Sequence, residues 1–184
     1  MTILGIAGSL REGSYNRSLL RAARELLPED VEHVEHEIGT LPFYDGDVEA
    51  AGDPEPVVSF KQAIRDADAL LIATPEYNRG VPGVLKNAVD WASRPPLGSP
   101  LTGKPVAIMG ASTGRGGTAR AQEQLRAALE FSRATVLEQP EVLVPEAFMR
   151  FDEHGELVDP GIRAELAELL DSLVHVAGGV TLAA

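Results

Sequence analysis

Hydrophobic and polar positions follow two different spacings along the chain, and each spacing predicts a kind of element. Short apolar runs, continuous or alternating with polar residues, predict strands, and apolar residues three and four positions apart predict amphipathic helices. The runs predict strands at about residues 2–8, 31–38, 69–74 and 105–110, and a fifth within 134–144. The helical spacing predicts helices at about residues 16–27, 57–66, 83–93, 119–133 and 162–176. Residues 39–56, rich in glycine, proline and aspartate, are expected to form a long connection.

Five strands that alternate with five helices predict an α/β fold, with a doubly wound parallel sheet covered by helices on both faces. The composition does not change along the 184 residues, so we expect one domain, residues 1–184. In such sheets a ligand binds outside the carboxyl ends of the strands, where the strand order reverses. The loops after the first, third and fourth predicted strands should therefore meet at one edge.

Composition and charge exclude several classes of function. The chain has no cysteine, which excludes disulfides, thiolate catalysis and cysteine metal sites, and we expect no metal site. Its net charge of −12 opposes nucleic-acid binding. It has neither an apolar run of about 20 residues nor a secretion signal, so we expect no membrane association and a cytoplasmic location. His33 and His36 alternate with glutamates in VEHVEHEI and are expected at ordinary surface positions.

The segment GSLREGSYNRSLL, residues 8–20, leaves the first strand through small polar residues and then begins a helix. Such a turn exposes backbone N–H groups and hydroxyls around an arginine, an arrangement that binds phosphate without a metal. Ser9 and Ser14 offer hydroxyls, and Asn16 offers an amide. Arg11 offers a guanidinium that can bind two phosphate oxygens. The alternative is an ordinary turn in which Asn16 caps the helix.

The loop after the third strand, TPEYNRGVPG, is stiffened by Pro75 and Pro82. Tyr77 is placed just after a central strand, where its ring can stack on a planar ligand. The alternative is a tyrosine that covers the end of the core. The next loop, GASTGRGGT at residues 110–118, is small enough for its backbone to approach a ligand closely, and its alternative is a solvated turn with a Thr118 helix cap.

Three segments together, GSLREGSYNRSLLRAA, PEYNRGVPGVLKNAVDW and STGRGGTARAQEQLR, resemble the NADPH-dependent FMN reductase family. This flavodoxin-like group includes chromate, quinone and azo-dye reductases. The resemblance extends from about Ile3 to Val144, and the middle segment is the most specific. It implies a flavodoxin-like, three-layer, five-stranded parallel sheet that forms one FMN-binding domain.

The resemblance also implies roles for residues in all three loops. The phosphate of FMN would be bound by the first loop. The second loop would flank the isoalloxazine ring and ribityl chain, and the third would border the ring near its pyrimidine end. The implied cofactor-binding residues are Ser9, Arg11, Ser14, Asn16 and Arg17 in the first loop, Pro75, Glu76, Tyr77 and Asn78 in the second, and Ser112, Thr113 and Gly114 in the third. Two departures are Arg79, where many relatives carry an aromatic or small residue, and GGTARAQ, which is one residue longer than the family's GGxRAQ.

The implied activity is that of an FMN-dependent NAD(P)H oxidoreductase. Hydride passes from NADPH or NADH to the bound flavin, and two electrons then pass to a quinone, azo, metal-oxyanion or flavin acceptor. The chemistry belongs to the cofactor, so no catalytic side chain is expected. Arg79, Arg115 and Arg120 are candidates for binding the 2′-phosphate of NADPH, and a homodimer or homotetramer is expected. The alternatives are a non-enzymatic electron carrier of the flavodoxin type and a nucleotide-binding module without flavin.

Overall fold

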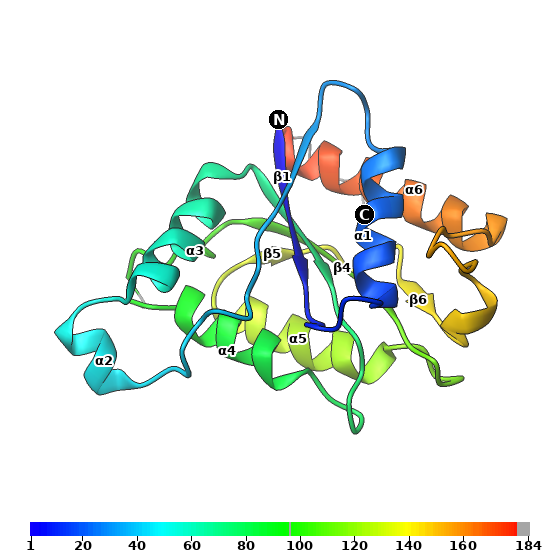
Figure 1. The fold of residues 1–184 in the computed structure, drawn as a ribbon. Helices are drawn as coiled ribbons and strands as arrows, with labels where there is room; N and C mark the ends of the chain where they lie inside the picture. Colours follow the sequence, from blue (N-terminus) through cyan, green and yellow to red (C-terminus); the bar gives the residue numbers. More distant parts are fainter. Residues whose placement is uncertain (96, 180–184) are drawn as a thin grey trace.

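A parallel sheet runs through the middle of the molecule in this computed structural model, which describes residues 1–95 and 97–179 (Figure 1). The described strands are β1 (Thr2–Ala7), β2 (Glu32–Glu35), β3 (Ala69–Ala73), β4 (Pro105–Ala111), β5 (Thr135–Val136) and β6 (Val142–Val144). They lie in the order β2-β1-β3-β4-β5, with β6 also paired to β4, and each pair is parallel. The chain runs outward from β1 to β2 and returns past β1 to β3, so the strand order reverses beside β1. The predicted doubly wound, flavodoxin-like sheet is confirmed.

Helices cover the two faces of this sheet. They are α1 (Tyr15–Leu26), α2 (Gly46–Ala51), α3 (Glu55–Asp66), α4 (Gly83–Ala92), α5 (Ala119–Phe131) and α6 (Pro160–Ala177), with a 3-10 turn at Ala147–Met149. The core on one face includes residues of α1 and α6, and the core on the other includes residues of α3, α4 and α5. The result is a three-layer arrangement, as the alternation of strands and helices predicts. Among the described residues, no helix is long and apolar enough to span a bilayer.

Neighbouring residues of the central strands point to opposite faces and supply both cores. Leu4 pairs in register with Leu70, which pairs with Val106, and all three lie in the core beneath α3, α4 and α5. Ile3 and Leu71 lie in the core beneath α1 and α6. Each large side chain buried in this way contributes about 1.5–3 kcal/mol to stability. These two cores fix the sheet, and the sheet fixes where its loops emerge.

Two elements differ from the sequence prediction. The expected fifth strand consists of two short strands, β5 and β6, on either side of Pro140, which has no N–H to donate to a neighbouring strand. The expected connection at 39–56 contains the short helix α2, whose first turn is capped by Asp45, because Asp45 Oδ1 accepts a hydrogen bond from Asp47 N at 2.8 Å. A helix of six residues is too short to show a periodic pattern.

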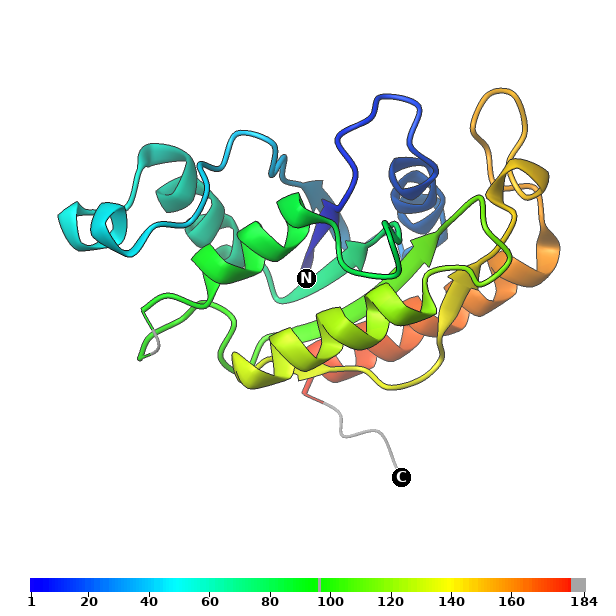
Figure 2. The same ribbon diagram turned by 90° about the horizontal axis from the view of Figure 1, so that it is seen from below.

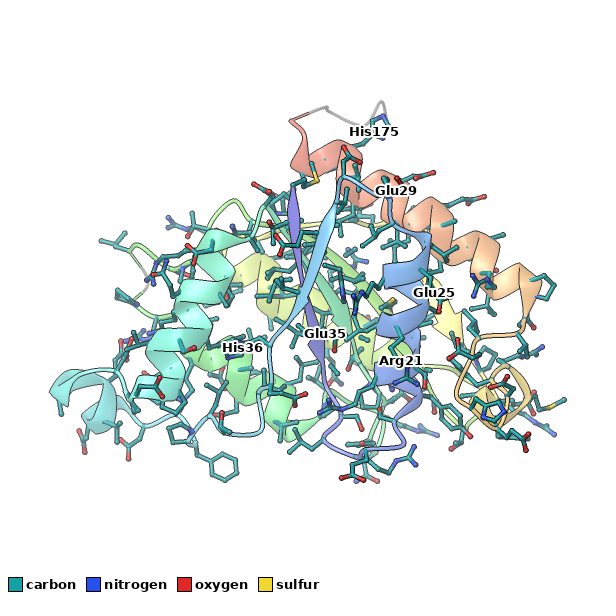
Figure 3. All side chains as sticks on the ribbon, turned by 45° about the horizontal axis from the view of Figure 1, so that its top comes forward. Arg21, Glu25, Glu29, Glu35, His36 and His175 are labelled. Atoms are coloured by element: carbon teal, nitrogen blue, oxygen red, sulfur yellow. The ribbon has the colours of Figure 1, made fainter. Side chains whose placement is uncertain are left out.

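The expectation of ordinary surface positions is wrong for His33 and His36, which are both half-buried. Both ring nitrogens of His33 are buried and have no hydrogen-bond partner among the described residues. A Cβ on Gly5 would lie 2.6 Å from His33 Nε2, so this glycine makes room for the ring. His36 lies just after β2 (Figure 3), and its ring is 5.2 Å from that of Phe60 in α3. The alternating pattern predicted exposure because it could not reveal that neighbouring elements partly cover His33 and His36, while the glutamates beside them stay exposed.

Candidate functional site

The loops after β1, β3 and β4 emerge side by side at the carboxyl edge of the sheet, as the topology requires (Figure 2). Between them is a hollow of about 200 Å³, which we call the switch-point cavity because it lies where the strand order reverses. Its lining residues are Ser9, Arg11, Ser14, Tyr15, Asn16, Pro75, Glu76, Tyr77, Ala111, Ser112 and Thr113. The structure therefore brings together nine of the residues predicted from the three loops. Three others, Arg17, Asn78 and Gly114, do not line the cavity.

The first wall of the cavity is the loop that leads into α1. Ser14 is the N-cap of this helix, because its Oγ accepts a hydrogen bond from Asn16 N at 3.2 Å. The alternative prediction that Asn16 caps the helix is therefore wrong. The remaining N–H groups of the first helical turn have no intrahelical partner, and the turn contains no acidic residue. The end of α1 at the cavity thus presents positive potential and unused donors.

The side chain of Asn16 does not cap α1, as its place in the sequence suggests, but binds the backbone of β4. Its Nδ2 donates to Ala111 O, and Ala111 N donates to Asn16 Oδ1, both at 2.9 Å. The side chain is buried and connects α1 to the end of β4. Its amide is therefore occupied by protein backbone, although the residue lines the cavity.

The two arginines of the first loop have opposite surroundings. Arg11 lines the cavity with its guanidinium carbon 5.9 Å from the centre of the Tyr15 ring, and it has no ion-pair partner among the described residues. Arg17 donates from Nη1 and Nη2 to the two carboxylate oxygens of Glu37, at 2.5 and 2.6 Å. This hydrogen bonding raises the pKa of Arg17 and lowers that of Glu37. Only Arg11 of this pair is available to an anion in the cavity.

The second wall is a tight hairpin formed by residues 77–80. Tyr77 N donates to Gly80 O at 3.2 Å, and Gly80 N donates to Tyr77 O at 3.1 Å. Asn78 and Arg79 between them have φ values of 50° and 63°, the left-handed pair of a two-residue hairpin turn. Tyr77 remains 52% exposed, so it does not cover the core, and its hydroxyl lies 3.5 Å from Ser9 Oγ. Its ring is available at the cavity, while Asn78 lies in the turn.

Glu76, also in this wall, bonds to the backbone of another element. Its Oε2 accepts hydrogen bonds from Arg120 N and Ala121 N, at 3.0 and 3.1 Å. These are N–H groups of the first turn of α5, so Glu76 caps that helix from a distance of more than forty residues in sequence. The predicted Thr118 side-chain cap is absent, because its hydroxyl instead accepts from Gln122 Nε2 at 2.9 Å.

The third wall is the glycine-rich loop after β4. Near the end of β4, just before this loop, a Cβ on Gly110 would lie 2.2 Å from Thr74 O and 2.3 Å from Thr118 Oγ1, so the close approach of the end of β4 to Thr74, just after β3, requires glycine. Ser112 and Thr113 then line the cavity. Gly114 N donates to Ser112 Oγ at 3.1 Å, a hydrogen bond within the loop that fixes its turn.

The sequence did not identify two lining residues, Tyr15 and Ala111. Tyr15 opens α1, and its ring lies 5.3 Å from that of Phe151, a contact across most of the chain. Ala111 has no side-chain chemistry that a sequence pattern could reveal. None of the predicted 2′-phosphate arginines lines the cavity, and all three are exposed, although Arg115 also pairs with Glu146 at 3.6 Å.

Comparison with known proteins identifies the family. The sequence model of the NADPH-dependent FMN reductases matches residues 1–149, which include every lining residue of the switch-point cavity. The chain belongs to the NADPH-dependent FMN reductase family. It is thus an oxidoreductase of a family that uses FMN and NAD(P)H.

Similar proteins agree with this assignment along nearly the whole chain. An NAD(P)H-dependent FMN reductase of Pseudomonas aeruginosa is 50% identical over 171 residues, 93% of this chain and 92% of the relative. A 2-hydroxy-1,4-benzoquinone reductase of a Burkholderia species is 44% identical over 93% of each chain. Among solved structures, the flavoenzyme NAD(P)H:(acceptor) oxidoreductase FerB of Paracoccus denitrificans superposes with a TM-score of 0.88 at 34% identity, covering 98% of this chain and 99% of that one.

Proposed function

We propose that the chain binds FMN in the switch-point cavity and uses NADPH or NADH to reduce a small planar acceptor, with quinones as the leading class. One observation carries this proposal. The cavity combines Arg11, which has no ion-pair partner among the described residues, with two serine hydroxyls and the end of α1, and it has the half-exposed ring of Tyr77 beside them. A ligand with an anionic end and a flat ring matches both features.

The first wall, the loop that leads into α1, would bind the phosphate. The guanidinium of Arg11 can donate two hydrogen bonds, and the hydroxyls of Ser9 and Ser14 can add two more. The positive end of the α1 dipole favours the same anion. Arg17 is committed to Glu37, so we assign it no part in holding the phosphate.

The other two walls, the hairpin and the glycine-rich loop, would orient the flavin ring. The hairpin holds Tyr77 so that its ring can flank a planar ligand, and Pro75 stiffens the approach to it. Ser112 and Thr113 supply hydroxyls on the opposite wall. When bound, FMN supplies the hydride and electron chemistry, so these residues bind and orient without acting as nucleophiles or proton donors.

Quinones lead the possible acceptors because of the named activities of relatives. The Burkholderia relative is a 2-hydroxy-1,4-benzoquinone reductase, and a protein of Escherichia coli that is 41% identical over 88% of this chain and 87% of its own is a quinone reductase. Azo compounds, metal oxyanions and free flavin are the other acceptors that the proposal includes.

An anaerobic titration tests the proposal. Apoprotein incubated with FMN should gain a flavin spectrum, and NADPH should bleach it within seconds. Steady-state rates with a benzoquinone, an azo dye, chromate and free FMN, each with NADPH and with NADH, then rank acceptors and donors. Failure to take up FMN would refute the proposal, and bleaching only over many minutes would indicate an electron carrier.

We also propose that the chain assembles as a homodimer or homotetramer. Several large apolar side chains are exposed, among them Phe43 at 84% and Phe131 at 91%, and a partner subunit would remove such surface from water. Light scattering behind a sizing column measures the mass, and a monomer at micromolar concentration would contradict this expectation.

A further inference from the structure

One helix, α5, is attached to both of the walls that would flank the FMN ring. The glycine-rich loop, residues 112–118, runs directly into its first turn. The opposite wall reaches the same turn through Glu76, whose carboxylate accepts from Arg120 N and Ala121 N at 3.0 and 3.1 Å. Because Thr118 makes no side-chain cap, this carboxylate from the facing loop supplies the side-chain cap of α5.

A second attachment lies one turn further along the helix. Gln124 Oε1 accepts a hydrogen bond from Val81 N at 3.2 Å, and Gln124 Nε2 donates to Arg79 O at 3.3 Å. The amide therefore bonds an acceptor within the hairpin and a donor of the residue that follows it. A Cβ on Gly80 would lie 2.9 Å from Gln124 Oε1, so the glycine lets the hairpin backbone come this close.

The hydrogen bonds of Glu76 and Gln124 hold the two sides of the cavity at a fixed distance from each other. Glu76 and Tyr77 line one side, and Ser112 and Thr113 line the other. Without a cap, the first turn of α5 would lose partners for two N–H groups and the favourable charge at its positive end. The glycine-rich loop, which ends at this turn, would lose its fixed position relative to the hairpin.

We propose that Glu76 and Gln124 are positioning residues that couple the hairpin to the glycine-rich loop and thereby set the width of the cavity that receives the flavin ring. Glu76 acts through the backbone of α5 and does not transfer a proton. This proposal rests on the proposed function for its effect on FMN, but the coupling itself is a property of the chain alone.

Amide hydrogen exchange and FMN titration of the apoprotein test the coupling. In Glu76→Ala, exchange in residues 112–121 should quicken about tenfold and the Kd for FMN should rise about tenfold, the scale of a lost cap. Glu76→Gln keeps an oxygen acceptor and should recover most of both losses. Gln124→Ala should quicken exchange at Val81 and weaken FMN binding severalfold.

Glu123→Ala is the matched control, because Glu123 is an exposed residue of the same helix with no side-chain hydrogen bond to either wall. It should change neither measurement. Exchange of the buried β3 amides should be the same in all four variants, which separates local loosening from global unfolding. If Glu76→Ala fails to fold, Glu76→Gln and Gln124→Ala still decide the matter.

Three results would overturn the inference. The first is unchanged exchange in residues 112–121 of Glu76→Ala. The second is quickened exchange with unaltered affinity for FMN. The third is a Glu76→Gln variant that binds FMN normally and turns over as poorly as Glu76→Ala, because a proton-transfer role predicts that pattern. If wild-type protein takes up no FMN, the proposed function fails, and the exchange measurements alone decide whether the two walls are coupled.

Discussion

The side chain of Asn16 makes the two hydrogen bonds that a neighbouring strand would make at the end of β4. It donates to Ala111 O and accepts from Ala111 N, at 2.9 Å each. One amide thus satisfies both backbone groups of a buried residue in the cavity wall. It also joins the end of α1 that we propose binds phosphate to the loop that would face the flavin ring, so we expect its loss to affect both stability and cofactor binding.

Asn16→Ala should lower the free energy of unfolding by about 2–3 kcal/mol, because it leaves a buried N–H and a buried C=O without partners. Urea unfolding of the apoprotein, followed by circular dichroism, measures the change. Asn78→Ala removes an exposed asparagine with no side-chain hydrogen bond to the described core and serves as a comparison, with a cost of about 1 kcal/mol for alanine at φ 50°. A loss below about 0.5 kcal/mol in Asn16→Ala would show that water satisfies the exposed groups.

Arg11→Ala should weaken FMN binding by about 1.5–3 kcal/mol, the scale of a hydrogen bond to a charged group. Arg17→Ala, six residues further on, should leave the affinity within about threefold, because its guanidinium is bonded to Glu37. Fluorescence quenching during titration of apoprotein with FMN measures both. Equal losses in the two variants would mean that Arg17 leaves Glu37 to bind the phosphate.

This difference between Arg11 and Arg17 marks the limit of what the sequence predicts. The strands follow from their apolar runs, and the topology then requires that the three polar loops meet. The partner of Arg17, however, lies twenty residues along the chain, beyond β2, and no local pattern connects them. The resemblance to a family assigned both arginines to one role, whereas the pairing of Arg17 with Glu37, just after β2, separates them.

Glu76 and Asn16 illustrate the same limit. Each was predicted at the cavity, and each lies there, but both use their side chains on distant backbone. Sequence indicates which residue types gather at an edge, because period and loop position depend on neighbours in the chain. It does not indicate which polar group is satisfied by which backbone, since that depends on tertiary contacts.

Gly110→Ala should destabilise the protein by about 3 kcal/mol or more and impair FMN uptake, because the added Cβ would overlap backbone oxygen at Thr74. Gly83→Ala, at the first position of α4, should be neutral or stabilising, because no atom lies within 4 Å of the new Cβ. Thermal unfolding and FMN titration of the two variants give the comparison. A Gly110→Ala protein that folds and binds FMN normally would contradict the close packing of the end of β4 against Thr74.

His33 should make stability fall in mild acid. Burial, followed by the charge of Arg24, lowers the pKa of His33, so the folded state favours the neutral ring. Its stabilising effect is complete above the ordinary histidine pKa of about 6.5 and is lost as the pH falls below that value. The free energy of unfolding of wild type should therefore decrease between pH 7 and pH 5 more steeply than that of His33→Leu. His154→Leu, which removes an exposed histidine, should keep the wild-type slope.

Tyr77→Ala should weaken FMN binding about tenfold or more and change the flavin spectrum, while the free energy of unfolding of the apoprotein changes by less than about 1 kcal/mol. The reason is that Tyr77 is 52% exposed, so the fold gains little from burying its ring, whereas a bound flavin would gain an aromatic neighbour. Tyr77→Phe should behave like wild type, because the hydroxyl makes only a 3.5 Å contact with Ser9. Titration with FMN and urea unfolding of the same preparations separate the two effects. Loss of the fold with retention of FMN affinity would instead assign the ring to the core.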